Sequence, residues 1–137
     1  MHSGTLEHIC INPDGPLCYC GSRGCLETYC SANALEQAAG MPVKEFFPLL
    51  REKKSPQIIQ VWKDFLNHLA FAMKNLNLVI DAPIIISGYL APYLQKKILN
   101  IWQSISIQPH HSYWIKHRFW SVPTDNIHRQ SERLCIM

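Results

Sequence analysis

Apolar residues recur at steps of three and four over one long stretch of the chain, and this spacing predicts an amphipathic helix over residues 56–77. Serine before proline is a favourable helix start, so Ser55 is the predicted N-cap and Pro56 the first helical residue. The apolar face comprises Ile58, Val61, Trp62, Phe65, Leu66, Leu69, Ala72, Met73 and Leu76. A face of this breadth is typical of a helix that packs into a core, and less often of one that binds a partner.

Shorter elements are predicted before this helix. A strand over residues 7–11 leads into a turn rich in proline and glycine. A helix over residues 25–39 ends at Gly40, because glycine is a common helix terminator. A second helix over residues 43–53 contains Pro48, which predicts a kink or a break.

After the long helix, three isoleucines and a serine at residues 84–87 stand between a proline and Gly88. This pattern predicts a short buried strand of the kind that parallel sheets use. Residues 92–104 are predicted to form a helix. The order of helix, buried strand, glycine turn and helix indicates the α/β fold class.

Composition narrows the class of protein. The 137 residues are 47% hydrophobic and 17% charged, which excludes a disordered chain and fits one domain, or part of one, with a hydrophobic core. No uncharged apolar run reaches the roughly 18 residues of a membrane span, and the N-terminus has no signal-peptide pattern. The net charge of +3 is too mild to argue for nucleic-acid binding. We therefore expect no membrane contact and no direct nucleic-acid binding.

Five of the six cysteines fall within residues 10–30. Without a secretory signal, clustered cysteines indicate metal ligands in a reducing compartment, so the expected location is cytoplasmic. A histidine with three cysteines is a common closed zinc set, and the predicted ligands of a structural Zn²⁺ are His8, Cys18, Cys20 and Cys25. Free buried cysteines or adventitious disulfides are the alternative.

Two glycines allow this loop to turn tightly, because Gly21 and Gly24 reach positive φ at little cost. Strand alternation would place Cys10 on the same side as His8, which makes Cys10 the substitute ligand. Cys30 is left over.

The pattern of His8, a ten-residue step to Cys18, and then Cys-x-Cys-Gly-x-x-Gly-Cys-x-Glu through Glu27 resembles the signature of the ROK family, the repressors, open reading frames and kinases that act on or respond to sugars. The resemblance covers roughly residues 3–100. It implies part of the C-terminal lobe of an actin-like ATPase (ribonuclease H-like) fold, with the zinc loop at residues 8–25. We assign residues 1–107 to this lobe fragment.

The resemblance also implies roles for individual residues. Glu27 and His8 would contact a sugar of the hexose or N-acetylhexosamine class, since a carboxylate and an imidazole bind neighbouring hydroxyls well. A solvated glutamate in a first helical turn is the alternative for Glu27. Gly88 matches the glycine turn beneath a nucleotide, although Ser87 replaces the first of the usual paired glycines.

Three departures from the family pattern bear on function. Thr5 and Glu7 stand where family kinases carry glutamate and glycine, so Thr5 would be a weak third sugar contact, and a Glu7 on a strand would point away from His8. The chain shows no glycine-rich phosphate loop, catalytic aspartate or helix-turn-helix. Asp125-Asn126 resembles the catalytic dipeptide only by coincidence.

Residues 108–137 lack the small-residue helix of the family, and we expect an atypical tail that is poorly ordered or frame-shifted. A truncated or frame-shifted gene product would explain both this tail and the absent lobe. Basic and aromatic side chains alternate in this tail, as they do in proteins that bind single-stranded nucleic acid. A tail whose sequence is under no functional selection would explain the pattern as well. His110, His111 and His117 are poor candidates for a metal site.

Three functions are therefore open. The preferred one is the sugar-binding portion of a sugar-responsive transcriptional regulator, because Thr5 departs from the kinase pattern. The second is a fragment of a ROK sugar kinase, in which ATP and Mg²⁺ would be needed by the full-length parent. The third is a small zinc-dependent interaction module. A homo-oligomer is expected.

Overall fold

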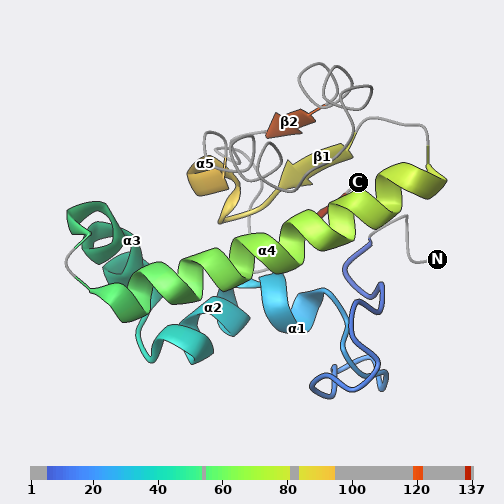
Figure 1. The fold of residues 1–137 in the computed structure, drawn as a ribbon, viewed down its shortest axis with the longest axis horizontal. Coiled ribbons are helices and arrows are strands. Elements are labelled where there is room, and N and C mark those ends of the chain that lie inside the picture. Colours follow the sequence, from blue (N-terminus) through green and yellow to red (C-terminus); the bar gives the residue numbers. More distant parts are fainter. Residues whose placement is uncertain (1–5, 54, 81–83, 95–118, 122–134, 137) are drawn as a thin grey trace.

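The computed structural model describes residues 6–53, 55–80, 84–94, 119–121 and 135–136, and most of these residues are helical. The helices are α1 (Glu27–Cys30), α2 (Ala32–Ala39), α3 (Val43–Glu52), α4 (Pro56–Val79) and α5 (Ala91–Leu94). The strands are β1 (Ile84–Ser87), β2 (Phe119–Ser121) and β3 (Cys135–Ile136). Figure 1 shows α4 crossing the molecule, with α1 and α2 drawn on one side and β1 and β2 on the other.

Helix α4 confirms the predicted long helix and extends it by two residues, to Val79. The Ser55 hydroxyl accepts a hydrogen bond from the backbone N–H of Ile58 at 3.4 Å, and Pro56 opens the helix as predicted. Helices α1, α2 and α3 all contact α4. Eight of the nine predicted apolar positions are buried, and Val61 is partly buried against the same core.

The predicted single helix over residues 25–39 is wrong, because Ser31 divides it into α1 and α2. The backbone of Ser31 is extended, with φ −90° and ψ 166°, and its hydroxyl accepts from the N–H of Ala34 at 3.0 Å. Ser31 thus starts a new helix instead of continuing the first. The predicted stop at Gly40 is confirmed, with φ at 67°.

Helix α3 runs through Pro48 as one element, so the predicted break is wrong, whereas the alternative of a kink stays a prediction. Pro48 lies on the exposed side, where water can bond the Lys44 carbonyl that lost its helical partner. The opposite side buries Phe46, Phe47 and Leu50 against the core, which holds the helix together.

The predicted strand at residues 84–87 is confirmed as β1, the centre of a sheet ordered β2-β1-β3. β1 pairs in parallel with β2 and antiparallel with β3, and Ile86 is buried in the core. The sequence predicted no element after residue 107, yet β2 and β3 both come from that tail. The division at residue 107 remains a prediction.

Helix α5 coincides with the start of the helix predicted over residues 92–104, and the rest of that range lies outside the described residues. None of the helices in the described part of the chain has the length and apolarity that a membrane crossing requires.

Candidate metal centre

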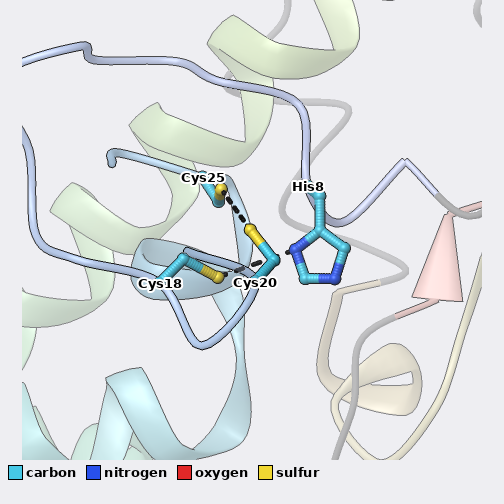
Figure 2. Close-up of side chains that lie close together, drawn as sticks. All are labelled: His8, Cys18, Cys20 and Cys25. Atoms are coloured by element: carbon cyan, nitrogen blue, oxygen red, sulfur yellow. Dashed lines mark hydrogen bonds between the residues drawn. The ribbon is translucent and has the colours of Figure 1, made fainter. Parts of the chain in front are cut away.

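Four side chains converge before α1. One ligand atom from each of His8, Cys18, Cys20 and Cys25 lies within 4.8 Å of all the others. The Sγ atoms of Cys20 and Cys25 are 3.5 Å apart, and Cys18 Sγ is 3.6 Å from His8 Nδ1. Figure 2 shows the four side chains pointing toward one another. The structure therefore brings together the four predicted ligands.

Two of the separations between ligand atoms match those around a tetrahedral zinc ion. Zn–S bonds of about 2.3 Å and Zn–N bonds of about 2.0–2.1 Å place neighbouring ligand atoms about 3.4–3.8 Å apart. The Cys20–Cys25 and Cys18–His8 separations, 3.5 and 3.6 Å, fall in that range. Three thiols and one imidazole fill all four positions, so the donor set suits a structural ion better than one that activates water.

A tight turn between Cys18 and Ser22 directs two of the cysteines inward. The N–H of Cys18 donates to the Ser22 carbonyl at 2.8 Å, and the N–H of Gly21 donates to the Cys18 carbonyl at 2.9 Å. Gly21 has φ of 88°, which favours glycine as expected from the sequence. This turn sets the close spacing of Cys18 and Cys20.

Gly24 is required for a different reason, because the backbone of Asn12 passes directly against it. Its φ is 64°, and a Cβ at this position would overlap the backbone carbonyl oxygen of Asn12. The N–H of Gly24 donates to the Pro16 carbonyl at 2.8 Å. Gly24 thus permits the crossing that carries the chain from His8 to Cys25.

The segment around His8 is not the strand predicted over residues 7–11. Residues 7–8 form a turn, and Cys10 makes a single antiparallel bridge with Cys25. Cys10 is exposed, and its thiol donates to the Arg23 carbonyl at 3.4 Å. It is not a member of the four-ligand group, so its predicted role as substitute ligand is not needed.

Glu7 contacts His8, contrary to the prediction that it points away. Its Oε1 lies 3.6 Å from His8 Nε2, and Glu7 is only 7% exposed. The turn removes the strand alternation on which the prediction rested. A carboxylate beside the free nitrogen of a ligating histidine orients the ring and fixes its tautomer. The sequence did carry a signal for this contact, because Glu7 is an acidic residue directly before the predicted ligand His8.

The cysteine sulfurs have divergent proton affinities. Burial, followed by the hydrogen bonds that the Cys25 thiol donates to Cys20 and Cys18, raises the pKa of the Cys25 thiol to about 12. A backbone hydrogen bond from Ser22 is the main reason that the pKa of Cys20 is lowered to about 7. A buried Cys25 thiolate therefore requires a cation beside it, as a zinc site supplies.

Two other predicted site residues, Glu27 and Gly88, are described in the structure and are not members of the four-ligand group. Glu27 is the first residue of α1, half-buried, and its N–H donates to the Glu7 carbonyl at 2.9 Å. Gly88 follows β1 with φ of 106° and accepts from the N–H of Ala91 at 3.1 Å. Thr5, His110, His111, His117 and Asp125-Asn126 lie outside the described residues.

Comparison with known proteins shows the family and part of the fold. The model of the ROK family matches residues 2–100. An N-acetylmannosamine kinase of Vibrio vulnificus is 29% identical over 93 residues, covering 63% of this chain and 31% of the kinase. A glucokinase of Thermotoga maritima is 50% identical over 32 residues, covering 23% of this chain and 10% of that enzyme.

A ROK hexokinase of Thermus thermophilus has a related fold, with a TM-score of 0.61 at 24% sequence identity. The match covers 72% of this chain and 37% of the hexokinase chain. The chain thus has part of that enzyme's fold, and it spans well under half the length of the relatives that it matches.

Proposed function

The chain belongs to the ROK family, and from this premise we propose that it is a zinc-stabilised, sugar-binding portion of a ROK protein. The convergence of His8, Cys18, Cys20 and Cys25 within 4.8 Å carries the proposal. Zinc, when bound, would supply rigidity to a loop that ends at the start of α1. Glu27 lies two residues after the last ligand.

Backbone contacts link the loop to the proposed sugar contacts. The hydrogen bond from the Glu27 N–H to the Glu7 carbonyl joins the first turn of α1 to the segment that carries His8. His8 directs Nδ1 toward Cys18 and Nε2 toward Glu7. Sugar hydroxyls both donate and accept hydrogen bonds, so the Glu27 carboxylate would accept hydrogen bonds from them while His8 Nε2 provides a second polar contact. Glu7 acts as a positioning residue for the His8 ring.

The parent of this portion is proposed to be a sugar kinase. Relatives named N-acetylmannosamine kinase and glucokinase support this choice, and ATP with Mg²⁺ would then serve the complete enzyme at a site that includes Gly88. The regulator predicted from Thr5 remains the alternative. A helix-turn-helix in the reading frame upstream of Met1 would favour the regulator, and a glycine-rich phosphate loop would favour the kinase. The homo-oligomer and the cytoplasmic location stay predictions.

Weak sugar binding that depends on Glu27 is the first expected result. Millimolar affinity corresponds to about 4 kcal/mol, which suits a site built from only part of a cleft. A hydrogen bond to a charged group contributes about 1.5–3 kcal/mol, so Glu27→Ala should weaken binding about tenfold or more. NMR titration with glucose and N-acetylated hexosamines measures this.

A matched control is Glu45→Ala, because Glu45 is also acidic, lies in the first turn of a helix, and is exposed on α3. This variant should bind sugar as the unmodified chain does. Chemical-shift changes that persist unaltered in Glu27→Ala would remove Glu27 from the site. Failure of any sugar to bind, together with capture of a defined protein partner, would favour the interaction module.

The 137-residue chain should transfer no phosphate. Phosphoryl transfer requires backbone donors and a metal ion around the γ-phosphate, beside a base that orients the attacking hydroxyl. The glycines are Gly4, Gly15, Gly21, Gly24, Gly40 and Gly88, and none forms a Gly-x-Gly loop. A coupled assay with ATP, Mg²⁺ and a sugar panel measures turnover. Activity that Glu27→Gln abolishes would show that the chain is a complete catalyst.

A further inference from the structure

Cys10 lies directly opposite Cys25, a member of the proposed zinc centre. The two residues form an antiparallel bridge. The flanking residues make the hydrogen bonds, from Ile11 N–H to the Gly24 carbonyl and from Leu26 N–H to the Ile9 carbonyl, both at 2.9 Å. Cys10 and Cys25 are therefore a non-hydrogen-bonded pair, in which Cα atoms lie about 4.5 Å apart and the side chains share a face.

This pairing meets the backbone requirement for a disulfide, whose Cα atoms are usually about 4.4–6.8 Å apart. The Cys10 thiol already lies beside the segment that contains Cys25, because it donates to the carbonyl of Arg23 at 3.4 Å, two residues before Cys25. Rotation of the two side chains is then enough to bring the sulfurs together. The backbone needs no rearrangement.

The two thiols differ in access. Cys10 is exposed, whereas Cys25 is 0% exposed. With Cys18, Cys20 and Cys25 committed to a metal, Cys10 is the accessible uncommitted thiol beside the centre among the described residues. Cys30 cannot take this role, since it is buried and its thiol donates to the Phe65 carbonyl within the core at 3.6 Å.

We propose that Cys10 and Cys25 form a redox-modification site, at which a disulfide withdraws Cys25 from the metal centre and releases the ion. The release rests on the proposed zinc function, whereas disulfide formation depends only on the two cysteines. The oxidant that we propose for this exposed thiol is a peroxide, which converts a thiol to a sulfenic acid.

The chemistry balances with hydrogen peroxide. The Cys10 sulfur attacks one peroxide oxygen, the O–O bond breaks, and Cys10 becomes a sulfenic acid as one water forms. The Cys25 sulfur then attacks the Cys10 sulfur, the S–O bond breaks, and the departing hydroxide takes a proton to form a second water. Two thiols lose two electrons to one peroxide. His8, Cys18 and Cys20 are left with one position of the tetrahedron unfilled.

The test is peroxide treatment of the zinc-loaded chain, followed by two independent measurements. A chromogenic chelator follows zinc release. Digestion with trypsin and Asp-N locates the disulfide, because cleavage before Asp14 and after Arg23 puts the cysteines on three peptides. The first contains Cys10, the second contains Cys18 and Cys20, and the third contains Cys25. Tandem mass spectrometry distinguishes Cys25 from Cys30. The expected product joins Cys10 to Cys25, with a mass lower by two hydrogen atoms.

Cys10→Ser is the decisive variant, because the side chain is exposed and the change should not disturb folding. It should lose the linked peptide and release zinc more slowly than the unmodified chain. Zinc release at an unchanged rate, or a disulfide between Cys20 and Cys25 in both proteins, would overturn the proposal. The same digest of the metal-free chain separates the two claims. If the chain never binds zinc but still forms the Cys10–Cys25 disulfide, the modification site is supported and the zinc centre is refuted.

Discussion

Replacing Cys18 and Cys25 together by serine should remove zinc from the chain and unfold the loop of residues 8–25. The unmodified chain, purified without added metal, is expected to contain one zinc ion. Structural zinc in small domains contributes about 10–16 kcal/mol of apparent binding free energy, and that free energy is coupled to folding. Elemental analysis measures the stoichiometry, and amide NMR spectra report the order of the loop before and after chelation.

Cys10→Ser is the matched control, because Cys10 lies in the same loop but outside the four-ligand group. It should retain one zinc ion and a folded loop under reducing conditions. Zinc that survives the double substitution would show that other residues hold it. Zinc lost from Cys10→Ser as well would restore Cys10 as a ligand. A zinc content near zero in the unmodified chain would refute the metal centre itself.

Gly24→Ala should destabilise the loop by about 3 kcal/mol and weaken zinc binding. The left-handed conformation, with φ at 64°, costs a non-glycine residue about 1–2 kcal/mol. The new Cβ would also overlap the Asn12 carbonyl, and overpacking of this kind costs about 1–3 kcal/mol. Competition with a zinc chelator measures the affinity, and denaturant titration of the zinc-loaded chain measures stability.

Gly21→Ala separates the two causes, since Gly21 also has a positive φ, at 88°, but nothing lies within 4 Å of its added Cβ. Only the conformational cost should remain, so the loss is expected to be about 1–2 kcal/mol. Equal effects of the two substitutions would mean that the chain crossing at Asn12 does not limit this loop. A neutral Gly24→Ala would contradict the backbone path itself.

The sequence predicted correctly those helix positions that depend on residues within one or two helical turns. The spacing of apolar residues, the Ser55 cap and Pro56 predicted α4 nearly to its ends, since each of these acts within one or two helical turns. Gly40 ended α2 for the same reason. The spacing of His8 and the three cysteines also predicted which four side chains converge, because a metal site limits both donor type and loop length.

The elements predicted from local signals were wrong at two places. The Ser31 hydroxyl bonds the Ala34 N–H and starts a second helix where residues 25–39 read as one. Pro48 failed to interrupt α3, because its exposed side tolerates a lost backbone hydrogen bond while Phe46 and Leu50 are held in the core.

The sequence by itself determined the family signature, the long helix, the strand at residues 84–87 and the identity of the four converging ligands. Only the tertiary structure decided how their surroundings are arranged. The turn at residues 7–8 brings Glu7 to His8, and the bridge places Cys10 opposite Cys25. The pairing of β2 and β3 with β1 likewise joins residues more than 30 positions apart. Contacts of this kind depend on where the backbone crosses itself, and periodicity along the chain carries no information about such crossings.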